Sequence, residues 1–149
     1  METKDELRYM DLALAEAQIA LSKGEIPVGA VIVRDGEILA LAHNQREADL
    51  DISGHAEIVA MRRAAKILGT WDLSNCSLFV TLEPCPMCAG AIKQARLRSV
   101  TFGASDPQFG GVVSNHHLFD GPNSPLVYPG VRASEAKEIL NRFFKNRRK

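Results

Sequence analysis

The chain of 149 residues is 46% hydrophobic and 24% charged, and its 18 basic residues balance 18 acidic ones. This length and composition fit one domain over residues 1–149 and exclude a wholly disordered chain. No apolar run approaches the roughly 20 residues of a membrane span, and the first residues lack the apolar core of a signal peptide. Three cysteines in such a chain argue against a disulfide framework and favour a thiol or metal role. We expect a cytoplasmic protein with no membrane contact.

Apolar spacing and turn residues divide the chain into alternating helices and strands. Thr3 and Glu6 form a capping box ahead of an apolar stripe with helical spacing, which Gly24 closes. Asp35-Gly36 lies between two short apolar runs and predicts a tight hairpin. In chain order we then expect strands over 28–33 and 37–42, a loop over 44–54, a helix over 55–68, a strand over 78–82, a helix over 86–96, a strand over 99–102, a loop over 104–125, a strand over 126–131 and a C-terminal helix.

The order of these elements predicts an α/β fold. The strand over 78–82, the helix after it and the strand over 99–102 form a parallel, right-handed unit, whereas the opening hairpin is antiparallel. Pro129 restricts the last strand to an edge of the sheet, because proline has no N–H to donate. We therefore predict a three-layer α/β/α sandwich with a mixed central sheet of about five strands.

Two short segments, each at the start of a predicted helix, carry the residues with metal and acid–base chemistry. They are His55-Ala56-Glu57 and Pro84-Cys85-Pro86-Met87-Cys88. The two cysteines are one helical turn apart, so both sulfurs can face one point, and the free N–H groups of a helix start stabilise thiolates. Together with the histidine they supply three ligands that suit Zn²⁺, and a catalytic zinc site leaves its fourth position to water.

Glu57 lies two residues after the histidine, within reach of that water without being a ligand. A carboxylate there can take a proton from the water and deliver it to a ring nitrogen, then to a departing amine. His-x-Glu followed by Pro-Cys-x-x-Cys is the signature of zinc nucleobase deaminases. The combination of the two segments, in this order, therefore predicts deamination.

The cysteines allow two other interpretations. Cys85 and Cys88 have the spacing of a thioredoxin-like redox pair, but that role leaves His55 and Glu57 without a function. A purely structural zinc site needs a fourth protein ligand. The candidates, none of which shows paired ligand spacing, are Cys76, His43, His116 and His117.

Beyond the zinc motif, the sequence resembles the bacterial tRNA-specific adenosine deaminases of the cytidine deaminase-like superfamily. The segments that carry the resemblance are Ile26-Pro27-Val28-Gly29-Ala30-Val31, His43-Asn44, His55-Ala56-Glu57, the run over 80–91, Phe102-Gly103-Ala104 and Phe143-Phe144-Lys145-Asn146-Arg147-Arg148. The resemblance implies conversion of adenosine to inosine at the wobble position of the tRNA-Arg anticodon, with release of ammonia. It also implies one Zn²⁺ per subunit and a homodimer with active sites near the subunit interface.

The resemblance also assigns roles to individual residues. It implies zinc binding by His55, Cys85 and Cys88, and proton transfer by Glu57. The substrate contacts that it implies are the side chain of Asn44 with the nucleotide, the backbone N–H of Ala56 with the purine, Asp106 with the sugar, and Phe143 and Phe144 as walls of the pocket for anticodon bases.

The C-terminal segment supports an RNA substrate, since five of its last eight residues are basic and two aromatic residues lie beside them. The plain alternative is that Phe143 and Phe144 pack the last helix and the tail is solvated. The chain departs from the common pattern of the family in two places. Residues 123–128 occupy the region where many relatives carry an Asn-His-Arg triplet, and Gly54 precedes the histidine where Thr, Ala or Met is usual. Two rival functions stay open: a deaminase of a free base or nucleoside (guanine, cytosine or cytidine), and a zinc-stabilised RNA-binding module without catalysis.

Overall fold

A computed structural model describes the backbone of residues 3–147 and has a five-stranded mixed sheet at its centre. The strands follow the spatial order β2-β1-β3-β4-β5, in which β1 pairs antiparallel with both neighbours and the other pairs are parallel. Their bounds are β1 Gly29–Arg34, β2 Glu37–His43, β3 Ser77–Leu82, β4 Ser99–Ala104 and β5 Leu126–Tyr128. Because β2, β3 and β4 run in the same direction, their C-terminal ends meet at one edge of the sheet.

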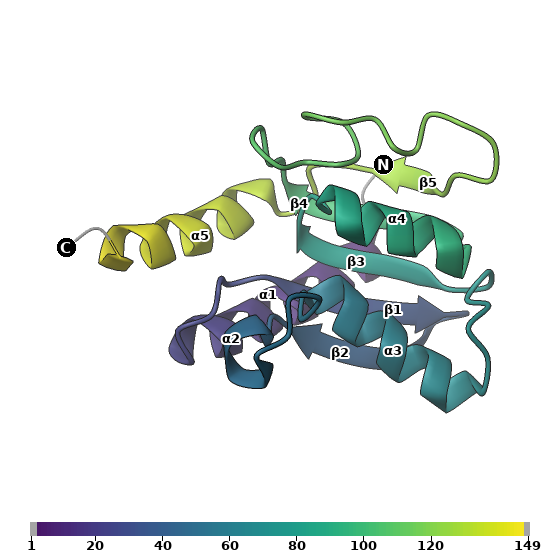
Figure 1. Cartoon of the computed structure of the whole chain (residues 1–149), viewed down its shortest axis with the longest axis horizontal. Coiled ribbons are helices and arrows are strands. Elements are labelled where there is room, and N and C mark those ends of the chain that lie inside the picture. Colours follow the sequence, from purple (N-terminus) through teal and green to yellow (C-terminus); the bar gives the residue numbers. More distant parts are fainter. Residues whose placement is uncertain (1–2, 148–149) are drawn as a thin grey trace.

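Helices cover both faces of this sheet, as Figure 1 shows, and this confirms the three-layer sandwich. One face carries α3 and α4, and the other carries α1, with α5 packed against α1 and β4. The helix bounds are α1 Lys4–Ser22, α2 Arg46–Asp49, α3 Ala56–Leu68, α4 Pro86–Ala95 and α5 Ala133–Arg147. No helix within residues 3–147 has the length and apolar character needed to cross a lipid bilayer.

The two faces of the sheet have separate apolar cores, because successive strand side chains point in opposite directions. On β1, Ala30 and Ile32 pack with α3 and α4. The residues between and after them, Val31 and Val33, pack with Tyr9 and other residues of α1 on the opposite face. These four consecutive side chains of β1 are all buried, which explains why the sequence of this strand is a continuous apolar run.

The local sequence signals are confirmed where they depend on short-range contacts. Thr3 and Glu6 form the capping box at the start of α1, with bonds of 2.8 and 3.1 Å. Asp35 and Gly36 both adopt positive φ, of 49° and 79°, as a tight hairpin turn between β1 and β2 requires. The β5 strand lies at an edge of the sheet, as Pro129 predicted.

Two expectations about the loops were wrong in detail. The segment over 44–54 is not all loop: it contains the one-turn helix α2, whose N-terminal N–H groups bond to a distant side chain, Glu25. The last strand ends at Tyr128 rather than at residue 131, because the next residue is Pro129, which has no N–H to continue the ladder with β4. Of the basic tail, Arg148 and Lys149 lie outside the described residues.

Candidate active site

The predicted site residues gather at the edge of the sheet where β2, β3 and β4 end. Asn44 follows β2, Glu83 and Cys85 follow β3, and Asp106 follows β4. The α3 and α4 helices both begin at this edge, and they bring their N-terminal residues to it (Figure 1). Ligand sites in open α/β sheets are found outside the carboxyl ends of the strands, so this is the expected place for a functional pocket.

The three predicted metal ligands form one group. Their ligand atoms all lie within 4.8 Å of one another, and His55 Nδ1 is 3.6 Å from Cys85 Sγ and 3.4 Å from Cys88 Sγ. Zinc bonds of about 2.3 Å to sulfur and 2.0–2.1 Å to nitrogen in a tetrahedron would place the ligand atoms about 3.6 Å apart. His55 and Cys85 are the N-cap residues of α3 and α4, and neither side chain caps its helix. The observed spacing therefore fits a zinc ion.

No fourth protein ligand joins this group among the described residues. The four candidates for that role are occupied or distant. Cys76 is buried at the start of β3, His43 Nδ1 lies 2.9 Å from Glu16 Oε1, and the loop residues His116 and His117 are exposed. Three protein ligands are the set of a catalytic zinc site rather than a structural one. A redox pair of cysteines would not require an imidazole nitrogen beside both sulfurs.

The thiols and the imidazole perturb one another strongly. A hydrogen bond from the Cys88 thiol lowers the pKa of Cys85 to about 4, although burial acts in the opposite direction. The pKa of Cys88 is raised in turn, because its thiol donates that hydrogen bond and is buried. The hydrogen bond with Cys85 raises the pKa of His55. Cys85 is thus a thiolate at neutral pH, and the thiolate is the form in which cysteine binds metals.

Glu57 lies beside the three ligands but is not one of them. It is the second residue of α3 and is 4% exposed, and this burial raises its pKa to about 7. A carboxyl group with a pKa near neutrality can both accept and donate a proton during a reaction. The geometry therefore fits the proton-transfer role that the sequence predicts for Glu57.

A pocket of about 330 Å³ opens onto these groups. It continues into a groove of about 730 Å³ beside α5, and four residues line both: Ile26, Leu82, Asp106 and Phe109. The other residues of the pocket are Val28, Asn44, Arg46, His55, Glu57, Glu83, Cys85 and Pro86. A pocket with a longer groove attached has space for a reacting base and for more of a polymeric substrate.

Asn44 lines the pocket, and the Ala56 N–H bonds to it and is not free to meet a purine. Asn44 is 7% exposed, lines the pocket, and accepts a 2.8 Å hydrogen bond from the Ala56 N–H through Oδ1. Ala56 is the first residue of α3, and the N–H groups at the start of a helix have no acceptor within the helix. A nearby side-chain oxygen is therefore the natural acceptor for the Ala56 N–H. In this structure Ala56 therefore orients Asn44, and a purine would have to share or replace that bond.

Asp106 also lines the pocket, and its conformation is held on both sides. Its side chain accepts hydrogen bonds of 3.2 and 3.1 Å from the N–H groups of Gln108 and Phe109. Its own N–H donates to Glu83 Oε1 over 3.0 Å.

Burial alone would raise the pKa of Glu83, but hydrogen bonds from Ser114 and from backbone N–H groups outweigh it and lower that pKa.

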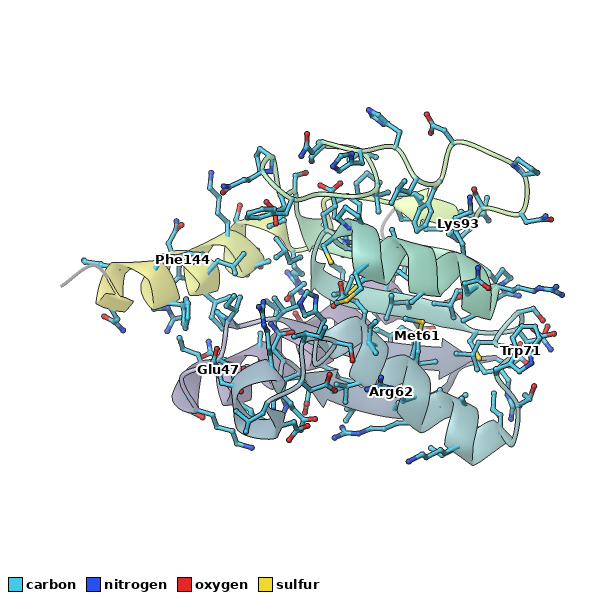
Figure 2. The ribbon with its side chains drawn as sticks, viewed as in Figure 1. Glu47, Met61, Arg62, Trp71, Lys93 and Phe144 are labelled. Atoms are coloured by element: carbon cyan, nitrogen blue, oxygen red, sulfur yellow. The ribbon has the colours of Figure 1, made fainter. Side chains whose placement is uncertain are left out.

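The two C-terminal phenylalanines have different surroundings. Phe144 is 46% exposed and lines the groove, whereas Phe143 is 8% exposed and packs edge to face with Phe144 at 5.3 Å. Figure 2 shows Phe144 on α5 and Glu47 on α2 at the same end of the molecule, opposite Trp71 and Lys93. Only Phe144 is thus presented to the groove, and Phe143 supports it from the interior.

Sequence reasoning missed several residues of the pocket. Arg46 and Phe109 line it directly, but neither lies in a recognisable motif. Glu25 and Glu83 hold the loops that carry these residues, and only Glu83, just before the Pro-Cys segment, had a signal in the sequence. Gly54, which departs from the usual residue before the histidine, permits close packing of this loop, because a Cβ there would lie 2.9 Å from Arg46 Cα.

Comparison with known proteins agrees with this geometry. Residues 4–148 match the family of MafB19-like deaminases. The chain belongs to this family. It is 47% identical over 150 residues to the tRNA-specific adenosine deaminase of Bacillus subtilis, covering 99% of this chain and 92% of the relative. The chain is therefore a deaminase, and the resemblance seen in its sequence is confirmed.

Solved structures support the same conclusion about the fold. A structure from a study of A-to-I editing by tRNA:A34 deaminases at the wobble position of transfer RNA superposes with a TM-score of 0.86 at 44% identity, covering 89% of this chain and 98% of that one. A guanine deaminase from Bacillus subtilis superposes with a TM-score of 0.64 at 39% identity, covering 70% of this chain and 66% of that one. The fold is the cytidine deaminase-like one that the sequence predicted.

Proposed function

We propose that this deaminase converts adenosine to inosine at the wobble position of the tRNA-Arg anticodon and releases ammonia. The observation that carries the proposal is the three-ligand group with buried Glu57 beside it, in a chain whose full-length relatives include tRNA-specific adenosine deaminases. We infer that residues 1–149 act as one deaminase domain. Because tRNA is found in the cytoplasm, we propose that the reaction takes place in the cytoplasm.

His55 Nδ1, Cys85 Sγ and Cys88 Sγ would hold one zinc ion per subunit. When bound, zinc supplies the Lewis acidity that lets water act as a nucleophile near neutral pH. The rest of the reaction depends on protein side chains. Water adds at C6 of the adenine, the amino group leaves as ammonia, and the product is inosine.

Glu57 would manage the protons of this exchange. Its pKa of about 7 lets it take a proton from the attacking water and give it to a ring nitrogen, then move a second proton to the departing amine. Asn44, oriented by the Ala56 N–H, would hydrogen-bond the base, and Asp106 would meet the sugar. Because the Glu57 side chain is buried, its protons would pass to and from the substrate rather than to bulk water.

The groove beside α5 would hold the nucleotides next to the reacting one. Phe144 and Phe109 are exposed aromatic side chains along it, and Lys137 adds a cation. Exposed rings stack on unpaired bases, and cations attract phosphates, so the groove suits a single-stranded loop. An anticodon loop is already unpaired, which lowers the cost of moving one base into the pocket.

The homodimer is part of the same proposal. Between α3 and α4 lies a mostly apolar cleft of about 540 Å³, edged by Trp71, which is 62% exposed. Figure 2 shows Met61 and Arg62 on α3 at this cleft. A second copy of the chain would bury this surface. Sedimentation should then give twice the chain mass of 16.3 kDa, and Ala65→Arg, which puts a charge in the cleft, should give single chains.

A paired turnover assay tests the function. The protein is incubated with a tRNA-Arg that has an ACG anticodon, and separately with adenosine, guanine, cytosine and cytidine. Inosine at the wobble position, without turnover of the small molecules, is the expected result, and binding of the tRNA should weaken steeply with salt. Turnover of a free base with the tRNA untouched would assign the protein to the free-base deaminases instead.

The proton-transfer role has its own test. Glu57→Ala should retain zinc and the fold but lose at least about 100-fold in kcat, because a positioned acid–base group contributes 10²–10⁴-fold. Glu138→Ala, an exposed change on α5, is the control and should leave turnover unchanged. Turnover by Glu57→Ala near the wild-type rate would rule out the mechanism and favour a zinc-stabilised RNA-binding role.

A further inference from the structure

Glu83 is a buried carboxylate outside the ligand group and with no assigned role in the reaction. It is 2% exposed, and its carboxylate accepts five hydrogen bonds. Four come from backbone N–H groups and the fifth from a hydroxyl. The donors are the N–H groups of Asp106, Val112, Val113 and Ser114 and the hydroxyl of Ser114.

All five donors belong to one wall of the pocket, the segment over 104–114. Within the segment, Asp106 and Phe109 line the pocket and the groove. Gly110 packs directly on the carboxylate, since a Cβ on it would lie 2.5 Å from Glu83 Cδ. The carboxylate therefore lies at the centre of this wall, and the backbone of the segment folds around it.

The wall has little regular structure of its own to fix its shape. Between the end of β4 at Ala104 and the start of β5 at Leu126, the described chain has only turns and bends. Buried backbone N–H groups that are not in a helix or sheet must find other partners, and Glu83 supplies those partners here. An apolar residue in its place would leave four N–H groups unpaired at the pocket.

Glu83 also connects this wall to the chemistry. It lies two residues before Cys85, at the C-terminal end of β3, and Gly111 N–H donates to the carbonyl of Pro84 between them over 2.7 Å. The wall is thereby held at a set distance from the ligand group. A base placed against Phe109 and Asp106 is placed against Glu57 at the same time.

We propose that Glu83 is a positioning residue: it fixes the segment over 104–114 so that Asp106 and Phe109 hold the nucleotide in register with Glu57. The identity of the nucleotide rests on the proposed function, but the ordering of the wall does not. This role is separate from metal binding and from proton transfer. It predicts that loss of the carboxylate weakens substrate binding while the ligand group stays intact.

The test is Glu83→Gln, which preserves the shape of the side chain. Each of the two carboxylate oxygens accepts at least one backbone N–H. Whichever oxygen the NH₂ group of glutamine replaces, it must therefore face an N–H donor. We expect amide hydrogen exchange over 104–114 to rise by about tenfold or more, with α4 unchanged. KM for the tRNA should rise about tenfold or more while kcat changes less, as when binding common to ground and transition state is lost. Zinc content should stay at the wild-type level.

Two further variants keep the result interpretable. Ser114→Ala removes one donor and should shift exchange and KM in the same direction by less, and it serves if Glu83→Gln does not fold. Val100→Ala, in the buried middle of β4, is the control for general destabilisation and should leave KM unchanged.

Two outcomes would overturn the proposal. The first is unchanged exchange over 104–114 together with unchanged KM in Glu83→Gln. The second is loss of zinc and kcat in parallel at constant KM, which would place Glu83 in the metal site instead. If wild-type protein fails to act on tRNA, the proposed function fails, yet the exchange measurement still decides the role of Glu83.

Discussion

The pocket has two loop walls, over 44–54 and over 104–114, and they are held in place in different ways. Each wall follows a strand end and contacts a carboxylate that is 2% exposed, Glu25 or Glu83. Glu25 accepts two N–H groups, those of Glu47 and Ala48 at the start of α2, over 3.1 and 2.8 Å. Glu83 accepts five bonds from a segment without a helix.

The difference teaches how much each wall depends on its carboxylate. The first wall has its own local bonds, including Gln45 N–H to the carbonyl of Gly54 at 2.8 Å and Ser53 to Asp51. The second wall also has local bonds, from the N–H groups of Gln108, Phe109 and Gly110 to Asp106, but four more of its N–H groups depend on the single side chain of Glu83. A change at the centre of the second wall should therefore cost more activity than a matched change in the first.

The largest effect is expected from Gly110→Ala. The new Cβ would press against the Glu83 carboxylate and the carbonyl of Asp106, both within about 2.5 Å, so the second wall must move. Displacement of a pocket wall by about 1 Å can lower kcat/KM about 100-fold. Overpacking should also cost about 1–3 kcal/mol of unfolding free energy, measured by denaturant titration. Gly121→Ala in the same loop, where a Cβ meets nothing within 4 Å, is the matched control.

A smaller loss is expected from Gly54→Ala in the first wall. Its Cβ would lie 2.9 Å from Arg46 N and Cα, which shifts α2 and the pocket-lining Arg46. Since Asn44 and Ala56 stay bonded to each other, we expect kcat/KM to fall about tenfold rather than about 100-fold. Steady-state kinetics beside Gly110→Ala measure the difference. A larger loss for Gly54→Ala would reverse the ranking of the walls.

Glu25→Gln should have a weaker effect on activity than Glu83→Gln. The glutamine keeps one acceptor oxygen for the N-terminus of α2, where the carboxylate accepts two N–H groups. We expect a loss of about 1–3 kcal/mol in unfolding free energy from the group left without a partner. Thermal unfolding and steady-state kinetics of the two glutamine variants, measured side by side, test this. Equal increases in KM would show that both walls depend equally on their carboxylates.

The smallest effect is expected from Ser53→Ala at the outer side of the first wall. Hydrogen bonds from the Ser53 hydroxyl and N–H lower the pKa of Asp51 below 3.8, so removal of the hydroxyl should raise that pKa toward 3.8. Because the folded pKa is depressed, this contribution to stability is present above pH 3.8 and is lost as the pH falls through the folded value. NMR titration of Asp51 measures the shift, and turnover at neutral pH should not change.

The sequence was sufficient wherever a signal is local or repeats with a regular spacing. The capping box at Thr3, the Asp35-Gly36 turn and the helix starts at His55 and Cys85 depend on neighbours along the chain, and each was predicted correctly. The grouping of the two cysteines could be predicted from the sequence for the same reason, since both lie on one helical turn. Strand direction followed from connection length, which made the order of layers predictable.

The tertiary structure alone decided how the pocket walls are built. Glu25 and Glu47 are 22 residues apart, and Glu83 and Val112 are 29 apart, so no periodic pattern links the members of either contact. The same holds for Ala56, whose N–H meets Asn44 instead of standing free. Residue type and spacing made the group of possible metal ligands of this protein predictable, because helix geometry places residues one turn apart together. Its substrate-facing walls depend on distant strand ends meeting at one edge of the sheet, which only the packed chain brings about.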